Sequence, residues 1–314
     1  MSATLLYRDP FFQQHETGNH VESPDRIVAV NAAIADTDLA DRCDDVEWTE
    51  ASEESLLRVH TPEYLARLEA FTRDGGGRIE QDTVVSPHSY HVARRAAGAA
   101  CDAVSRVCGG KAKNAFCLLR PPGHHALADG AMGFCLLNHA AIAAAHARDA
   151  EGVRRVLIVD WDVHHGNGTQ DIFYRDPDVA FFSAHRWPFY PGSGRTEETG
   201  SGPGLGTTRN LPLPFGIAAD DYLEKFRQSL ETIAAKQRPE LIVLSAGFDA
   251  HHADPVGSLG LCEDDFSTLS RCVLDVAAVH CQGRVVSLLE GGYNPQALGA
   301  CVKIHLESLV SDQT

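Results

Sequence analysis

The sequence contains no apolar run long enough to cross a membrane. A transmembrane helix needs roughly 20 consecutive apolar residues, and no stretch of this chain approaches that length. The N-terminal residues also lack the basic segment and apolar core of a secretory signal peptide. We therefore expect a cytoplasmic protein that does not bind a membrane.

Cysteine pairs and basic charge are scarce as well. The 9 cysteines are odd in number and form no C-x-x-C motif, which favours reduced core residues over disulfides or a structural zinc site. Lysine and arginine total 27 against 43 acidic residues, so the formal net charge is -16. A polyanion is not attracted to nucleic acid, so we expect no nucleic-acid partner.

Short apolar runs alternate with helix-like segments along the whole chain. The runs are nearly all apolar, as expected for parallel strands that are covered on both faces. This alternation predicts an α/β fold with a layered parallel sheet, and the lack of repeats or low-complexity linkers predicts a single domain over residues 1–314. The strands that we expect are Ala115–Leu119, Val156–Asp160, Val179–Ser183, Leu241–Ser245 and Val285–Leu289.

Helix starts are marked by capping side chains that stand directly before a proline. Alanine-rich helices are expected over residues 93–107 and 139–148. The segment 191–214 is rich in glycine, threonine and proline and has no apolar period, so we expect a long ordered loop, which in a compact domain is usually functional. The capping pairs are Ser23-Pro24, Thr61-Pro62, Ser86-Pro87 and Asn294-Pro295.

Histidine, aspartate and tyrosine side chains follow four of the predicted strands. The motifs, in chain order, are RPPGHH, WDVHHGNG, AGFD and EGGY. Each has a bland explanation, because a histidine pair often decorates a loop and an aspartate often caps the next helix. In an open parallel sheet, however, ligands bind at the carboxyl ends of the strands. The same residue classes at four strand ends therefore favour one functional site.

A metal site is predicted from the spacing after the second of these strands. Asp160, Asp162 and His164 alternate, so in an extended segment they point to the same side. Asp162 and His164 can therefore bind one cation, and Asp249 from another strand end completes a set of three ligands. Three protein ligands with an open position are typical of catalytic zinc, whereas structural sites are closed by four.

These motifs resemble those of the histone deacetylase and acetylpolyamine amidohydrolase superfamily. RPPGHHA, DWDVHHGNGTQDIFY, SAGFDAHHADPVG and LEGGYN occur in the family's order, and the similarity extends from Gly18 to Tyr293. Asn167 and the LEGGYN ending are similar to the class II branch, and the acidic, alanine-rich composition resembles that of prokaryotic members. The resemblance implies a single α/β domain with a central, mostly parallel eight-stranded sheet.

The resemblance implies the same three zinc ligands and adds catalytic residues. His124 and His125 match the family's tandem histidines, and Tyr293 matches its transition-state tyrosine. Water would attack the acyl carbonyl at the zinc, with His125 as general base and then general acid and with Tyr293 as oxyanion stabiliser. Asp160 is expected behind His124 and Asn167 behind His125, and a neutral amide raises a histidine pKa less than a carboxylate does.

A substrate tunnel and a structural potassium site are also implied by the resemblance. Phe134 and Tyr190 match the tunnel walls, and Asp82 matches an acid at the rim. Val256 stands where polyamine-selective members carry an acid. The residues that match the potassium site are Asp160, Asp162, His164, Ser183 and Ala184.

The predicted function is zinc-dependent hydrolysis that removes acetyl, or another short acyl group, from an amine. Val256 favours the side chain of acyl-lysine, in a peptide or a protein, as the substrate. One alternative is the deacetylation of an acetylpolyamine or another small acylamine by the same residues. A second alternative is a catalytically weak acyl-lysine binder, and the intact ligands, tandem histidines and Tyr293 weigh against it.

Overall fold

Eight strands form a single sheet in which every neighbouring pair is parallel. The computed structural model describes residues 4–311, and the strand order is β2-β1-β5-β10-β9-β6-β7-β8. The predicted α/β fold with an eight-stranded sheet is therefore confirmed. The strands are β1 (Thr4–Tyr7), β2 (Cys43–Asp45), β5 (Asn114–Cys117), β6 (Val156–Asp160), β7 (Val179–Arg186), β8 (Thr208–Leu213), β9 (Leu241–Ala246) and β10 (Val285–Leu289), and β3 (Gly77–Arg78) and β4 (Val84–Val85) form a separate antiparallel pair.

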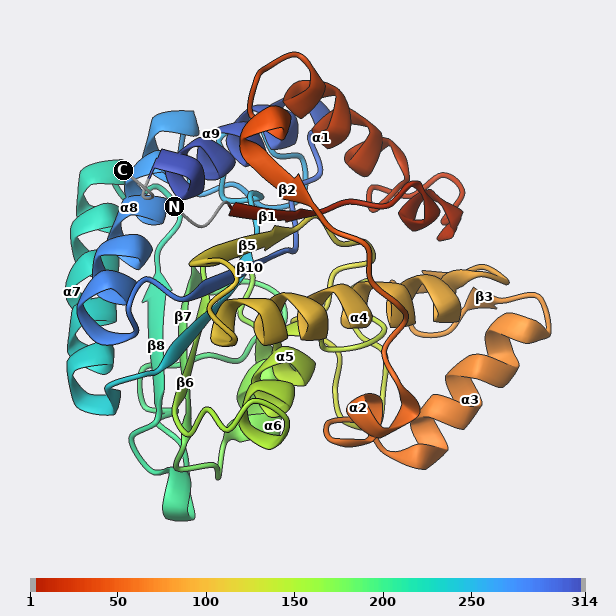
Figure 1. Ribbon diagram of the computed structural model, residues 1–314, viewed down its shortest axis with the longest axis horizontal. Coiled ribbons are helices and arrows are strands. Elements are labelled where there is room, and N and C mark those ends of the chain that lie inside the picture. Colours follow the sequence, from red (N-terminus) through yellow and green to blue (C-terminus); the bar gives the residue numbers. More distant parts are fainter. Residues whose placement is uncertain (1–3, 312–314) are drawn as a thin grey trace.

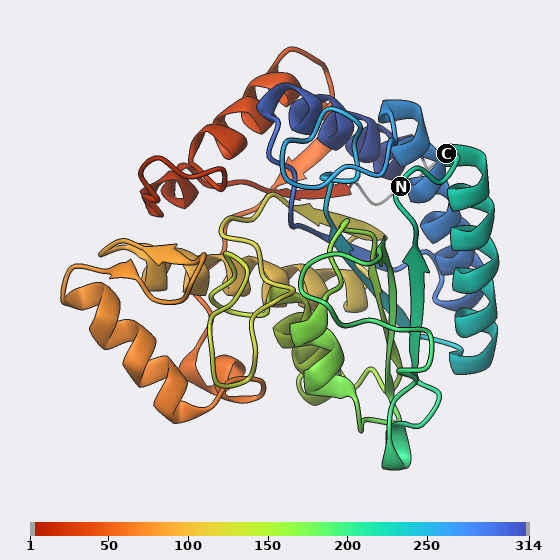
Figure 2. The ribbon, with the colours of Figure 1, turned by 180° about the vertical axis from the view of Figure 1, so that it is seen from behind.

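Helices cover both faces of the sheet (Figures 1 and 2). One face carries α4, α5 and α6, with α2 and α3 outside them, and the other carries α1, α7, α8 and α9. The helices are α1 (Asp25–Ala35), α2 (Glu53–Leu57), α3 (Pro62–Arg73), α4 (Ser89–Cys108), α5 (His139–Asp149), α6 (Asn167–Phe173), α7 (Ala219–Gln237), α8 (Glu263–His280) and α9 (Pro295–Ser311).

The sheet separates two hydrophobic cores, as the unbroken apolar character of its central strands predicts. In β6, Val156 and Ile158 pack into the core under α4 and α5, whereas Leu157 and Val159 pack into the core under α1 and α7–α9. Both sets are buried because successive side chains of a strand point to opposite faces. The small alanines of α4 and α5 let these helices lie close to the sheet, as expected from their composition.

The five predicted strands are β5, β6, β7, β9 and β10, with ends that differ by up to three residues. Two of the four predicted helix caps are confirmed: the side chain of Thr61 accepts the N–H of Tyr64, and that of Asn294 accepts the N–H of Ala297. The other two are wrong. The carbonyls of Ser23 and Ser86 accept the N–H groups of Arg26 and Ser89, so each serine begins a turn and does not cap a helix with its side chain. The helices start after the prolines, α1 at residue 25 and α4 at residue 89.

The prediction of a loop over residues 191–214 is wrong in its last part. Residues 208–213 form β8, the edge strand beside β7. Its sequence, TRNLPL, shows no apolar run because an edge strand is only partly covered. Pro212 is tolerated because an edge strand pairs on one side only, whereas in a central strand the missing N–H would cost a hydrogen bond of the sheet. Residues 191–207 form the loop, interrupted by a single 3-10 turn at Gly202–Gly204.

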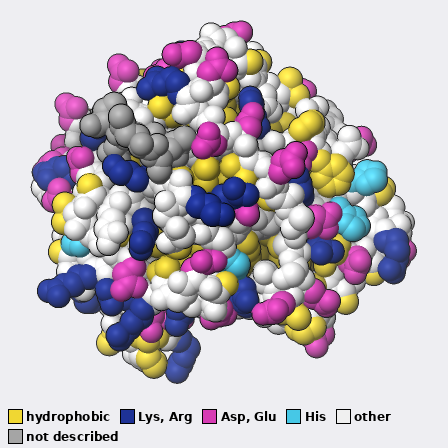
Figure 3. All heavy atoms as spheres, in the orientation of Figure 1, with side chains coloured by type: hydrophobic (Ala, Val, Ile, Leu, Met, Phe, Trp, Pro, Cys, Tyr) yellow, Lys and Arg dark blue, Asp and Glu magenta, His cyan; other side chains and the backbone are white. Residues whose placement is uncertain are grey.

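The surface agrees with the composition. Acidic side chains are spread over the face drawn in Figure 3, among lysines and arginines. Among residues 4–311, no helix combines the length and the apolar character that a membrane crossing requires.

Candidate active site

The loops that leave the carboxyl ends of β5, β6, β9 and β10 bring the predicted residues together. The register pairs Asp160, the last residue of β6, with Ser245 of β9 and Ser183 of β7. Because these strands end at the same edge, the segments that follow them meet there. Asp162 and Asp249 are distant in the sequence, yet their carboxylates belong to one cluster.

The three predicted metal ligands form a compact, buried group. One ligand atom from each of Asp162, His164 and Asp249 lies within 4.8 Å of the others. His164 Nδ1 is 3.0 Å from Asp162 Oδ1 and 3.0 Å from Asp249 Oδ2. Asp162 Oδ2 also accepts the N–H of Gly291, and Asp249 Oδ1 accepts the N–H of Val163, so backbone amides orient both carboxylates.

This donor set fits one divalent cation. The hydrogen bond of His164 Nδ1 goes to Asp162 Oδ1, so the nearby and buried Asp249 Oδ2 has no hydrogen-bond partner among the described residues. An unpaired buried carboxylate oxygen is costly. Burial and the neighbouring Asp162 carboxylate raise the pKa of Asp249 to about 7, as expected for two acids that share a site without a cation. One nitrogen and two carboxylate oxygens with a vacant side are the ligands that catalytic zinc takes.

Two glycines make room for the carboxylates. A Cβ atom on Gly247 would lie 2.1 Å from Asp162 Oδ2, and one on Gly291 would lie 2.4 Å from Asp249 Oδ2. Any larger residue at either position would displace a ligand. The glycines of AGFD and EGGY are therefore part of the site's construction.

The tandem histidines lie against the metal ligands. His124 Nδ1 is 2.9 Å from Asp160 Oδ2, and its Nε2 is 3.8 Å from Asp162 Oδ1. Burial alone would lower the pKa of His124, but the carboxylates of Asp160 and Asp162 raise it well above its usual value. The resemblance implies that Asp160 lies behind His124, and the structure brings the two side chains into contact.

His125 has a different environment from His124, although the centroids of the two rings are only 4.0 Å apart. Its Nδ1 donates to Asn167 Oδ1 at 2.7 Å, which leaves Nε2 as the free acceptor. Burial and the positive charge on His124 lower the pKa of His125 well below its usual value. A neutral imidazole with an unprotonated Nε2 can accept a proton, so His125 is suited to act as a base.

Tyr293 is held from both sides. Its ring lies edge-on to Phe134, with 5.7 Å between centroids, and the Arg26 guanidinium lies 5.0 Å from the ring centre. Its backbone N–H donates to Asp254 Oδ2. Burial raises the pKa of Tyr293 well above its usual value, so the hydroxyl stays protonated and is available as a donor.

A pocket of about 210 Å³ leads to these groups. All four predicted tunnel residues line it: Phe134, Tyr190, Val256 and Asp82. Tyr190 stands edge-on to the ring of His125, with 5.2 Å between centroids. The remaining lining residues are His125, Gly133, His164, Phe189 and Tyr293.

Two of the five residues that match a potassium site lie on the strand next to β6, and the other three end β6 or follow it. Ser183 and Ala184 belong to β7, and Ser183 is paired in register with Asp160. The Ser183 hydroxyl lies 2.9 Å from His185 Nδ1. The potassium site stays a prediction from the resemblance.

Sequence reasoning missed two residues of the site. Phe189 stacks on the ring of the metal ligand His164, with centroids 5.1 Å apart and planes 17° from parallel. Glu290 is buried under the tandem histidines and accepts the N–H groups of Gly123 and His124. The position of Glu290 directly after a predicted strand, in the same motif as Tyr293, is the signal that could have found it.

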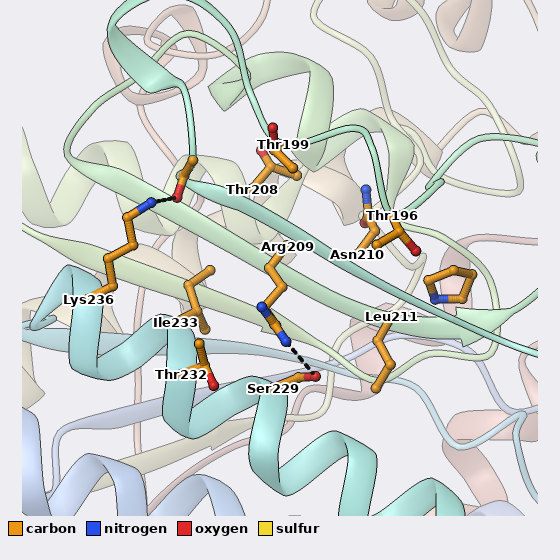
Figure 4. Close-up of a pocket in the computed structure, with 12 residues that line it drawn as sticks. Thr196, Thr199, Thr208, Arg209, Asn210, Leu211, Ser229, Thr232, Ile233 and Lys236 are labelled. Carbon is orange, nitrogen blue, oxygen red and sulfur yellow. Dashed lines mark hydrogen bonds between the residues drawn. The ribbon is translucent and has the colours of Figure 1, made fainter.

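A larger hollow, of about 330 Å³, lies elsewhere, between β8 and α7 (Figure 4). Its Arg209 points toward Ser229, and its Lys236 toward the backbone carbonyl of Gly206. None of the 12 lining residues is a histidine or an acid. This hollow therefore lacks the groups for metal binding or acid–base catalysis.

Comparisons with known proteins agree with this geometry. The Histone deacetylase domain family matches residues 20–309. The Histone deacetylase-like amidohydrolase of Pseudomonas aeruginosa is 40% identical over 298 residues, which cover 95% of this chain and 78% of that protein. The human Polyamine deacetylase HDAC10 is 38% identical, and the match covers 99% of this chain and 47% of that protein.

Comparison with solved structures shows the same fold as a histone deacetylase domain. The crystal structure of the HDA15 HD domain superposes with a TM-score of 0.92 at 35% identity, covering 99% of this chain and 90% of that one. The family match, the relatives and the shared fold all extend over nearly the whole sequence. The chain belongs to the histone deacetylase family and is a hydrolase of the deacetylase type.

Proposed function

We propose that this protein removes acetyl groups from the side chain of acyl-lysine in a zinc-dependent reaction. The observation that carries the proposal is the pocket of about 210 Å³, which ends at His125, His164 and Tyr293. Phe134 and Tyr190 line its walls, and aromatic walls suit the aliphatic chain of lysine. The amide at the end of that chain would then lie among the catalytic groups.

The residues have separate tasks in this reaction. Asp162, His164 and Asp249 would hold the zinc ion, which polarises the acyl carbonyl and makes water more acidic when it is bound. His125 takes a proton from the attacking water through Nε2 and later delivers one to the leaving amine. His124, charged beside Asp160, orients the water and stabilises negative charge. Tyr293 donates its hydroxyl to the developing oxyanion.

The residues at the pocket mouth favour a peptide substrate. Val256 presents an apolar wall, which offers nothing to the second ammonium group of a polyamine. Asp82 also lines the pocket, and its carboxylate can accept N–H groups from a peptide backbone. Burial and the adjacent Glu80 raise the pKa of Asp82, which is consistent with an acid that lacks a cationic partner.

A second candidate substrate is an acetylpolyamine. It is supported by the similarity to Polyamine deacetylase HDAC10 and by a second acid, Glu80, beside the pocket residue Asp82. The net charge of -16 would also attract a polycation.

A substrate panel tests the proposal. The zinc-loaded protein is assayed on an acetyl-lysine peptide, free acetyl-lysine and acetylspermidine, and kcat/KM is measured for each. The proposal expects the highest kcat/KM for the peptide. A higher value for acetylspermidine would establish the second candidate, and no turnover of any acylated amine would refute both. Metal analysis of the purified protein tests the zinc assignment.

A further inference from the structure

Glu290 is a buried acid to which the proposed reaction gives no task. It follows β10 directly, and only 1% of its surface is exposed. Its hydrogen-bond donors are uncharged: two backbone amides and one serine hydroxyl. The charged His124 ring, with a nitrogen within 4.8 Å of a Glu290 oxygen, offsets part of the cost of burying this carboxylate but donates no hydrogen bond to it. The role of the carboxylate must therefore be sought in the groups that it does bind.

The carboxylate of Glu290 joins three strand ends. Its Oε2 accepts the N–H of Gly123 at 2.6 Å and the N–H of His124 at 3.2 Å, in the segment that follows β5. Its Oε1 accepts the Ser245 hydroxyl at 3.0 Å, near the end of β9. Its own N–H donates to Ala246, also in β9. The start of the tandem-histidine segment is thereby tied to β9 and β10.

We propose that Glu290 is a positioning residue and that the length of its side chain (its reach) is what matters. Its Oε2 accepts the Gly123 and His124 amides and so sets the positions of the His124 and His125 rings. Pro121 and Pro122 precede these amides and have no N–H of their own. The two bonds from Glu290 therefore hold the first backbone donors after the two prolines. This inference rests on the proposed function for its catalytic consequence, but not for its structural one.

Two conservative variants separate reach from charge. In Glu290→Gln, the amide oxygen can accept both N–H groups and the NH₂ group can donate to the Ser245 hydroxyl, so the positioning is kept and the charge is lost. In Glu290→Asp, the charge is kept, but the side chain is one methylene shorter and cannot reach both amides. Positioning predicts that the glutamine variant works and that the aspartate variant fails.

The chain offers a matched control. Glu240 Oε2 also accepts two successive backbone amides, those of Arg154 at 2.8 Å and Arg155 at 3.3 Å. This contact lies at the opposite end of the sheet, before β6 begins. Glu240→Asp therefore makes the same chemical change away from the site and should leave kcat unchanged.

The first measurement is steady-state kinetics on the acetyl-lysine peptide. We expect Glu290→Asp to lower kcat at least tenfold with KM within threefold of the wild type, and Glu290→Gln to keep kcat within threefold. A kcat for Glu290→Asp within threefold of the wild type would overturn the proposal. An equal loss in both variants would also overturn it, because charge and not reach would then be the cause.

The second measurement is amide hydrogen exchange, which needs no activity. We expect exchange at Gly123 and His124 to be at least tenfold faster in Glu290→Asp than in the wild type, and unchanged in Glu290→Gln. Unchanged exchange in Glu290→Asp refutes the positioning role. If the wild type turns over no acylated amine, the proposed function fails, and the exchange data still decide the role of Glu290.

Discussion

Replacing Tyr293 by phenylalanine removes one hydroxyl and leaves the ring in place. The ring contacts with Phe134 and Arg26 are retained. Burial and nearby charges alone account for the raised pKa of Tyr293, without a hydrogen bond from its hydroxyl to another described residue. The folded protein therefore loses no internal hydrogen bond, and we expect Tm to stay within about 2 °C of the wild type. The loss should instead be confined to the transition state.

The size of that loss follows from the role of the hydroxyl. An oxyanion donor in a site closed to water contributes about 3–4 kcal/mol to transition-state stabilisation. Since each 1.36 kcal/mol is roughly a factor of ten in rate, kcat should fall about 10²- to 10³-fold. KM should change little, because the hydroxyl acts mainly on the charge that develops during the reaction.

The assay is release of the free amine from an acetyl-lysine peptide, with zinc content measured for each preparation. Tyr222→Phe is the matched control, because the Tyr222 hydroxyl is also buried without a hydrogen-bond partner, whereas Tyr222 belongs to α7 and does not line the pocket. Its kcat should equal that of the wild type. A kcat for Tyr293→Phe within threefold of the wild type, at equal zinc content, would refute the assigned role.

Three further predictions concern the base, the metal and the substrate. Asn167→Asp places a carboxylate beside His125 Nδ1, where Asn167 Oδ1 now lies at 2.7 Å, and should raise the pKa of His125. Because the base must be neutral, the acidic limb of the kcat/KM–pH profile should move to higher pH, and an unmoved limb would contradict this. Asp249→Asn should weaken zinc binding at least about 100-fold, as measured by metal titration. It should not lower the Tm of the metal-free protein at pH 7, because the pKa of Asp249 is raised to about 7 and its buried charge therefore does not stabilise the fold. Val256→Glu should raise kcat/KM for acetylspermidine relative to the acetyl-lysine peptide. One added charge pair in a partly closed pocket should change this ratio about tenfold. An unchanged ratio would show that Val256 does not select the substrate.

Much of the fold could be predicted because the central strands are buried on both faces. Val156–Asp160 reads as a strand from its composition alone, since both of its faces enter a core. The edge strands β2 and β8 carry no such signal. Residues 208–213 look like a loop in the sequence, and only pairing with β7 makes them a strand.

The sequence by itself determined which residue types follow each strand, and from them it predicted a metal site with Asp162, His164 and Asp249 as ligands beside two histidines. It could do so because parallel strands end at one edge, a rule that needs no coordinates. Only the tertiary structure decided the distances, such as the 3.0 Å from His164 to both carboxylates. It alone also placed Phe189 against His164 and Glu290 beneath His124, because such contacts depend on register and on the path of each loop, which local sequence does not encode.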